Sequence, residues 1–301
     1  MSETYSHSRL SSYENCPRKF QYRYLWKLPP ESESIEAFVG KRVHEVLERL
    51  YRVTQRGRLP SLPKVIERYH QLFDDAHDSH TVRIVREGMT LDFYRELGEH
   101  CLANYYHDHY PFDRDETLAL EEHVRFSLDA EGRYRMQGFV DRIARAKDGA
   151  IEIQDYKTSA RVPSKSQIAE DRQLALYQLG LGARFGVDRP VRLVWHFLRQ
   201  GKTVISTRAP AQLARLAEET RGLIDRIRSA TDFPARPSPL CGWCEYRQGC
   251  DASRAFEGAP YSRPIAEPAA PTAAVARAPK RPHARRPETP DTDQLAFRFG
   301  S

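Results

Sequence analysis

The central sheet is predicted by two stretches of sequence, Gly138-Phe-Val-Asp-Arg-Ile143 and, after a short gap, Ile151-Glu-Ile-Gln-Asp-Tyr-Lys-Thr158. Side chains alternate between the two faces of a strand, so the odd-numbered residues of the second stretch share one face. That face begins with isoleucines and ends with Asp155 and Lys157. Hairpin pairing of the two strands would bring Asp141 beside Asp155. The pattern therefore predicts a sheet that is buried at one end and carries chemistry at the other.

The two neighbouring carboxylates indicate a metal site. Two acids held close together repel each other unless a cation neutralises them, and no arginine in these stretches is an obvious partner. Hard oxygen ligands suit Mg²⁺ or Mn²⁺. Such a cation can activate a water molecule and hold a phosphate oxygen.

The rest of the chain shows the period of a helix in some stretches and of a strand in others. Ser8 is the expected N-cap of the first helix. The predicted helices span residues 8–15, 35–55, 62–76, 82–108, 166–185 and 210–230. The predicted strands span residues 118–128, 134–143, 150–157, 191–198 and 203–207. This order indicates an α/β or α+β core with a helical N-terminal addition.

Composition separates a folded body from a tail. The chain has 301 residues, of which 40% are hydrophobic, so a real core is expected. Residues 258–301 contain eight prolines and few large apolar side chains, a composition typical of disordered segments. We therefore expect a folded domain over 1–257 and a disordered tail over 258–301.

Charge and hydropathy restrict the setting. The formal net charge of +6 permits a nucleic-acid partner without showing one. No stretch approaches the ~20 apolar residues of a membrane-spanning helix, and the first residues lack the features of a secretory signal. We expect a cytoplasmic protein with no membrane partner.

Asp141 and the Asp155-Tyr156-Lys157 element together resemble the core of the PD-(D/E)XK nuclease superfamily, and the surrounding sequence resembles its RecB-like exonuclease branch. The stretch Gly40–Glu48, which contains His44, resembles the N-terminal helix of that branch. Gln173 and Tyr177 match its Q-x-x-x-Y element, whose spacing puts both on one helical face. Each motif alone also fits an ordinary surface strand or packed helix, but all of them occur in the expected order.

The resemblance implies a restriction-endonuclease-like core, a mixed central sheet flanked by helices. It implies that Lys157 orients or deprotonates the attacking water, and that Gln173 and Tyr177 position the active site or the DNA backbone. The metal ligands implied are His44, Asp141, Asp155 and the backbone carbonyl of Tyr156. The implied reaction is metal-dependent hydrolysis of DNA phosphodiesters.

Four cysteines lie at the two ends of the expected body: Cys16 near the start, and Cys241, Cys244 and Cys250 at the end. Four thiolates can hold Zn²⁺ or an iron–sulfur cluster, and the spacing alone does not choose between them; unligated thiols are the third alternative. The arrangement resembles the iron-staple nucleases of the RecB-like branch, including AddB and CRISPR-associated nucleases, which implies a [4Fe–4S] cluster. Cys101 has no partner in this pattern and is expected to pack within a helix.

The resulting hypothesis is a metal-dependent DNA nuclease, an exonuclease with a preference for single-stranded DNA, acting in repair or recombination. The alternative is a non-catalytic DNA-binding or scaffold subunit of a helicase–nuclease or CRISPR-adaptation complex. The chain has no Walker A motif, since the glycine that should precede Gly201-Lys202-Thr203 is replaced by His196. A helicase would therefore be a separate partner.

The C-terminal end suggests a docking peptide. Its sequence Gln294-Leu-Ala-Phe-Arg-Phe299 resembles the short peptides by which bacterial repair proteins bind the sliding clamp. Gln294 and the apolar anchors Leu295, Phe297 and Phe299 would make the contact. A chance hexapeptide, or a strand added to the edge of the chain's own sheet, are the alternatives.

Overall fold

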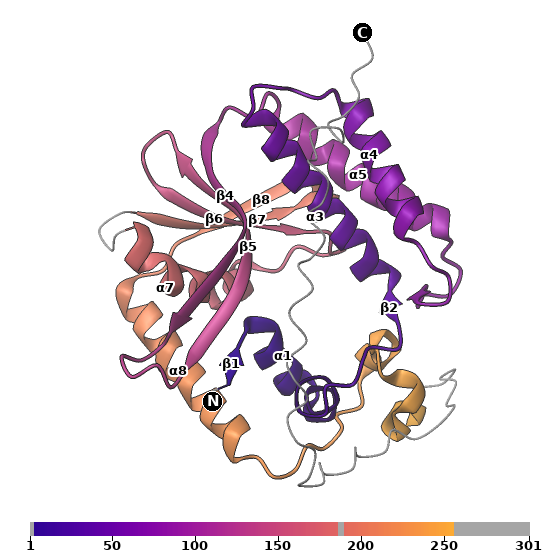
Figure 1. Ribbon diagram of the computed structural model, residues 1–301, viewed down its shortest axis with the longest axis vertical. Helices are drawn as coiled ribbons and strands as arrows, with labels where there is room; N and C mark the ends of the chain where they lie inside the picture. Colours follow the sequence, from indigo (N-terminus) through magenta and orange to yellow (C-terminus); the bar gives the residue numbers. More distant parts are fainter. Residues whose placement is uncertain (1–2, 186–189, 256–301) are drawn as a thin grey trace, which may run out of the picture. The chain divides into compact units, whose positions relative to one another are not determined.

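The computed structural model describes residues 3–185 and 190–255 (Figure 1). The chain divides into two units, Met1–Ile265 and Ala266–Ser301, and only the first contains described residues. The tail predicted over 258–301, with its docking residues Gln294, Leu295, Phe297 and Phe299, lies outside the described part of the chain.

A mixed six-stranded sheet forms the centre of the first unit, as predicted. Its strands are β1 (Thr4–Tyr5), β4 (Asp115–Ser127), β5 (Arg135–Ala146), β6 (Ile151–Lys157), β7 (Val191–Phe197) and β8 (Lys202–Ser206). The order is β1-β5-β6-β7-β8, with β4 also paired to β5. β1 with β5 and β6 with β7 are parallel pairs, whereas β4 with β5, β5 with β6 and β7 with β8 are antiparallel.

Strand β5 is shared by three partners, and this sharing creates the opening for the site. β4 pairs with it at residues 135–140 and 142–146. On the other edge, β1 pairs with Arg135 and Met136, and β6 pairs with residues 142–145. Among the described residues, positions 137–141 of that edge therefore have no strand beside them. Asp141 lies at the point where β5 and β6 separate.

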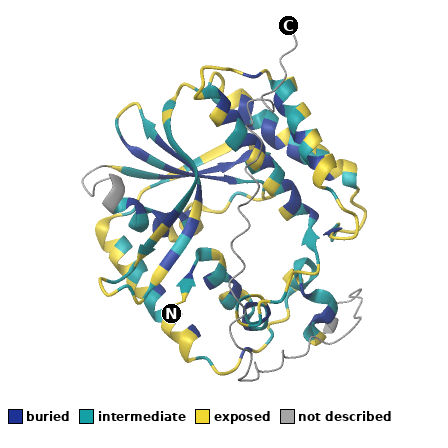
Figure 2. Cartoon of the chain, in the orientation of Figure 1, coloured by how far each residue is buried: buried dark blue, intermediate teal, exposed yellow. Residues whose placement is uncertain are grey.

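Helices cover both faces of the sheet (Figure 1). The helices α3 (Ile35–Thr54), α4 (Leu62–Ala76) and α5 (Leu91–His109) form one apolar cluster, which includes Tyr156 of β6. On the opposite face, α7 (Gln173–Phe185) and α8 (Pro210–Ser229) pack against the strands, with Leu174 and Trp195 in the centre. The short α6 (Lys165–Glu170) precedes α7. Buried residues accordingly recur along one side of each long helix (Figure 2).

The N- and C-terminal segments of the described body pack together near β1. The N-terminal segment contains α1 (His7–Asn15), α2 (Pro17–Phe20) and a π-helical turn at Gln21–Leu25. A third apolar cluster joins this segment to the start of β5 and to α8. The C-terminal segment contains the 3₁₀ turns Pro239–Trp243, Arg247–Gly249 and Asp251–Ala255. A further 3₁₀ turn, Leu198–Gln200, links β7 to β8.

Two helix starts predicted from the sequence are wrong. The first helix begins at His7 because Ser6, not Ser8, accepts a hydrogen bond from the backbone N–H of Arg9. The helix predicted over 82–108 begins only at Leu91, capped by Thr90. Val82 and Arg83 instead form strand β3, which pairs with β2 (Glu33–Ser34).

The helix predicted over 166–185 is two helices, α6 and α7. Asp171, at the end of α6, leaves the helical conformation with ψ 123°. Its carboxylate then accepts a hydrogen bond from the backbone N–H of Gln173, at 3.0 Å. An aspartate that caps the next helix in this way competes with helix continuation.

A buried arginine ties the strands to α3. Arg142 of β5 is 1% exposed and pairs with Asp115 of β4. It also donates to Gln154 of β6 at 2.9 Å, and its guanidinium lies 3.8 Å from the centre of the Tyr51 ring of α3. A buried charge is tolerated only when it is paired and hydrogen-bonded in this way. Arg142 therefore fixes β4, β5, β6 and α3 relative to one another.

We predict that Arg142→Met lowers the free energy of unfolding by about 3–5 kcal/mol, because it leaves the Asp115 carboxylate without its buried partner. Urea unfolding followed by circular dichroism measures this. The matched control is Arg145→Met, on the same strand, whose pair with Glu116 is exposed and is expected to contribute at most about 1 kcal/mol. Equal losses in the two variants would contradict a special role for the buried pair.

Candidate active site

Three elements bring their polar residues together where β5 and β6 separate. His44 of α3 donates from Nε2 to the backbone carbonyl of Tyr156, at 2.8 Å. Its Nδ1 lies 3.5 Å from Oδ2 of Asp141. The same oxygen of Asp141 accepts a hydrogen bond from the backbone N–H of Tyr156, at 2.7 Å. The structure thus brings together His44, Asp141 and the Tyr156 carbonyl, three of the ligands predicted from the sequence.

Glu121 of β4 completes this group and was missed by the sequence reasoning. Ligand atoms of His44, Glu121 and Asp141 all lie within 4.8 Å of one another. Glu121 has a φ of 48°, in the left-handed region that is uncommon for residues other than glycine. Such backbone strain is concentrated at functional sites. No motif marks Glu121 in the sequence, because the local irregularity of the strand turns its side chain toward α3.

Burial and the neighbouring charges shift the pKa values of Glu121 and His44. Burial, reinforced by the Asp141 charge, raises the pKa of Glu121 to about 7. Burial opposes the charged form of His44, but the adjacent Asp141 carboxylate outweighs it and raises the pKa of His44 to about 9. Two carboxylates held this close repel each other, and a cation bound between them would stabilise both charges.

Asp155 and Lys157 of β6 form a pair on the other side of Asp141. Lys157 Nζ lies 2.7 Å from Oδ2 of Asp155, which is 4% exposed. Burial raises the pKa of Asp155 to about 6, with the Lys157 charge opposing and the Asp141 charge reinforcing the shift. The neighbouring Asp155 carboxylate keeps the pKa of Lys157 above its ordinary value despite burial. The lysine is therefore held charged.

Gln173, the first residue of α7, bridges this pair. Its Oε1 accepts from Lys157 Nζ at 2.9 Å, and its Nε2 donates to Oδ1 of Asp155 at 3.0 Å. Because an amide offers both a donor and an acceptor, it can hold a carboxylate and an ammonium group in fixed positions. Gln173 is thus placed as a positioning residue for Asp155 and Lys157.

Tyr177 lies one turn further along α7 and packs into the core. It is 7% exposed, and burial raises its pKa to about 12. A Cβ atom on Gly138 of β5 would come within 2.2 Å of its ring, so only glycine allows this close approach. Tyr177 therefore sets the distance between α7 and the strand that carries Asp141.

The donors present fit a hard divalent cation. The imidazole of His44, the carboxylates of Glu121 and Asp141, and the Tyr156 carbonyl offer mainly oxygen ligands, as Mg²⁺ and Mn²⁺ prefer. Asp155, predicted as a further ligand, faces Lys157 and Gln173 in this structure.

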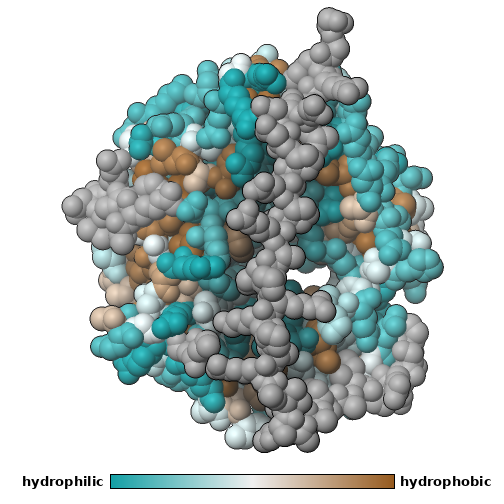
Figure 3. Space-filling model, viewed as in Figure 1, coloured by the Kyte–Doolittle hydropathy of each residue, from teal (hydrophilic) through white to brown (hydrophobic). Residues whose placement is uncertain are grey.

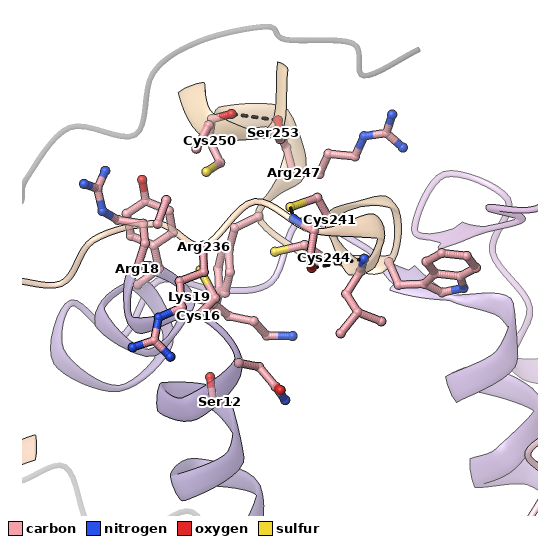
Figure 4. A pocket seen from close by; sticks show the side chains of 18 of the residues that line it. Ser12, Cys16, Arg18, Lys19, Arg236, Cys241, Cys244, Arg247, Cys250 and Ser253 are labelled. Carbon is pink, nitrogen blue, oxygen red and sulfur yellow. Dashed lines mark hydrogen bonds between the residues drawn. The ribbon is translucent and has the colours of Figure 1, made fainter. Parts of the chain in front are cut away.

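The four predicted cluster cysteines line one pocket of about 450 Å³ between the two ends of the body (Figure 4). Cys16 follows α1, and Cys241, Cys244 and Cys250 belong to the C-terminal turns. Their sulfur atoms point into the same space (Figure 4). Among the described residues, no three of these sulfurs lie within 4.8 Å of one another. Burial raises the pKa of Cys244 to about 11.

Protein contacts close this pocket from both sides. Arg18 donates to the backbone carbonyl of Phe233 at 3.0 Å, and Lys19 pairs with Glu245 at 2.7 Å. Ser253 Oγ donates to the carbonyl of Cys250 at 2.7 Å. Cys101 lies elsewhere, fully buried in α5 among the residues that pack against α3, as expected for a packing residue.

Comparison with known proteins identifies the family. A family model for the PD-(D/E)XK nuclease superfamily matches residues 4–251. The chain therefore belongs to the PD-(D/E)XK nuclease superfamily. Membership implies a nucleic-acid substrate and phosphodiester hydrolysis.

Two solved structures are similar to this chain. One, from Eubacterium rectale, is described as a "Putative exonuclease"; it is 15% identical, with 88% of this chain and 91% of that chain covered and a TM-score of 0.47. The other is described as SSO0001; it is 17% identical, with 83% and 86% covered and a TM-score of 0.35. A search of curated proteins gave no match. Within the described ranges, no helix is long and apolar enough to cross a membrane.

We predict that Glu121→Gln weakens Mn²⁺ binding at least about tenfold, since it removes one charged ligand of the group. Isothermal titration calorimetry with the full chain measures the dissociation constant. The control is Glu116→Gln, on the same strand but paired with the exposed Arg145, which should leave the affinity unchanged. Unchanged affinity of the Glu121 variant would remove this residue from the site.

Proposed function

We propose that the protein is a Mg²⁺- or Mn²⁺-dependent deoxyribonuclease of the RecB-like branch, an exonuclease that prefers single-stranded DNA. The observation that carries the proposal is the pairing of two arrangements. One is the acidic group of His44, Glu121 and Asp141, and the other is the Lys157 ammonium held by Asp155 and Gln173. The first arrangement suits a metal-bound phosphate, and the second suits the attacking water.

Each side chain has a role that follows from its contacts. A bound divalent cation would lower the pKa of a coordinated water and neutralise charge on the phosphate. His44, Glu121, Asp141 and the Tyr156 carbonyl would hold it, and Asp155 pairs with Lys157. Lys157 orients the attacking water and offsets the negative charge that develops on the phosphate. Gln173 keeps Lys157 in place, and Tyr177 sets the spacing of α7 from β5.

For the cysteine pocket we propose a [4Fe–4S] cluster bound by Cys16, Cys241, Cys244 and Cys250. Tetrahedral zinc with Zn–S bonds of about 2.3 Å brings its sulfurs to about 3.8 Å from one another. No three of the four thiols lie within 4.8 Å of one another, and they line a pocket with room for a larger group. Arg18, Lys19, Arg236 and Arg247 also line the pocket and offset the charge of four thiolates. The cluster would fasten the N-terminal segment to the C-terminal one.

The partners remain a proposal from the sequence. A separate helicase would supply single-stranded ends, and the C-terminal residues Gln294, Leu295, Phe297 and Phe299 would dock on the sliding clamp. Binding of a synthetic peptide of residues 288–301 to purified clamp tests the second idea.

We predict that Asp141→Ala and Lys157→Ala each lower the cleavage rate at least about a hundredfold, the usual scale for loss of acid–base or electrostatic assistance, while DNA binding is retained. End-labelled single-stranded, double-stranded and flapped DNA with Mg²⁺ or Mn²⁺ reports rate, polarity and substrate preference together. Asp148→Ala, in the exposed turn between β5 and β6, is the control. Undiminished cleavage by either active-site variant would refute the assignment, and an inactive wild type that binds DNA would favour a scaffold subunit.

We predict that protein purified without oxygen is brown, with a broad absorbance near ~400 nm typical of thiolate-bound iron–sulfur centres. Cys250→Ala should lose the colour and unfold more readily, because cluster binding is coupled to folding. Cys101→Ala should keep the colour, since this thiol lies outside the pocket. Colourless wild-type protein with one zinc ion per chain would overturn the iron–sulfur proposal.

A further inference from the structure

A pair of stacked rings, one exposed and one half-buried, lies on the β4–β5 hairpin. Phe139 of β5 is 57% exposed, and its ring lies 4.5 Å from that of His123 on β4, with the ring planes 12° apart. Apolar residues reach the surface of the molecule only in separate patches among mostly hydrophilic ones on the face shown in Figure 3. A single exposed apolar side chain is common on protein surfaces, so the neighbours of Phe139 decide whether it has a role.

The stacked pair faces the same side of the sheet as the metal-ligand group. Val124 and Val140 point into the cluster that packs under α7. Because side chains alternate along a strand, their neighbours His123 and Phe139 point to the opposite side, that of α3. Asp141, two residues beyond Phe139, contacts His44 of α3 on that side.

The register of β4 against β5 arranges these residues as successive cross-strand pairs, which lie progressively further from the metal-ligand group. His123 is paired with Phe139, and Arg125 with Gln137. Glu121 and Asp141 lie between two further pairs of this register, Leu120 with Arg142 and Glu122 with Val140. Successive cross-strand pairs on one face are two residues apart, about 6.8 Å along the strand. This matches the spacing of successive nucleotides in an extended single strand.

The next cross-strand pair after the two rings, Arg125 with Gln137, is polar and carries a positive charge. The Arg125 guanidinium is exposed and donates to Nε2 of His123 at 3.4 Å, and the Gln137 side chain lies at the same distance from that nitrogen. Aromatic faces beside positive charge are the recurring means by which proteins hold single-stranded nucleic acid, with bases on the rings and phosphates on the cations.

We propose that the Phe139–His123 pair is a stacking platform for a base of single-stranded DNA next to the scissile phosphate, and that Arg125 contacts the following phosphate. This inference rests on the proposed nuclease function and names how the site would select its substrate. Inside a duplex both faces of a base are covered by its neighbours, so away from a duplex end only an unpaired base can lie on the Phe139 ring. The platform therefore favours single strands at the entrance to the site.

The test compares two single-stranded oligonucleotides of equal length, one of thymidines and one in which the central positions are abasic, so that phosphates remain and bases are removed. Fluorescence anisotropy with the full chain in EDTA measures binding without cleavage. The wild type should bind the thymidine strand at least about fivefold more tightly, the lower bound for one stacked base. Phe139→Ala should bind both strands with the same affinity, and Phe139→Tyr should retain the wild-type preference.

Ile205→Ala is the matched control, because Ile205 of β8 is 56% exposed but lies on a strand at the far edge of the sheet; its preference should equal that of the wild type. A wild type without preference, including one that binds neither strand, overturns the platform. A Phe139→Ala variant that still prefers the thymidine strand also overturns the platform. Because binding is measured without metal, a wild type that prefers the thymidine strand but never cleaves DNA would refute the nuclease function and leave the platform standing.

Discussion

The arrangement of the site depends on one hydrogen bond, from the backbone N–H of Tyr156 to the Asp141 carboxylate. It forms where β5 and β6 separate. The Tyr156 N–H would bond a backbone carbonyl of β5 if the two strands stayed paired, and here the Asp141 carboxylate accepts that hydrogen bond instead. The carboxylate is therefore fixed to the backbone of β6. The carbonyl of the same residue binds His44. One residue of β6 thus connects the ligands contributed by α3 and β5, and each depends on the sheet dividing at this point.

The division of the sheet is stabilised directly beneath the site. Arg142 follows Asp141 in sequence but points into the interior, where Asp115, Gln154 and the Tyr51 ring surround it. A buried ion pair contributes little net stability compared with apolar packing, but it penalises every arrangement that leaves the charge unpaired. The register of β5 against both β4 and β6 is therefore specified next to Asp141.

The sequence predicted which of these side chains lie together wherever a regular period carried the information. Alternation along β6 placed Asp155 beside Lys157, and helical spacing placed Gln173 and Tyr177 on one face of α7. Glu121 could not be found in this way, because it reaches the site through a left-handed backbone conformation that no simple pattern encodes. The break between α6 and α7 was missed because Asp171 caps the next helix. Local backbone conformation and side-chain hydrogen bonds, rather than periodicity, determine the position of Glu121 and the break after α6.

The cysteine pocket and the active site are connected through α1. Glu14, two residues before Cys16, pairs with Arg172, whose guanidinium also reaches Ser11. Arg172 immediately precedes Gln173, the residue that holds Lys157. Whatever fixes Cys16 against the C-terminal turns therefore also fixes the start of α7. A group bound by the four thiols would thus be linked to Lys157 through a chain of contacts, from Cys16 through α1 and Arg172 to the Gln173 amide.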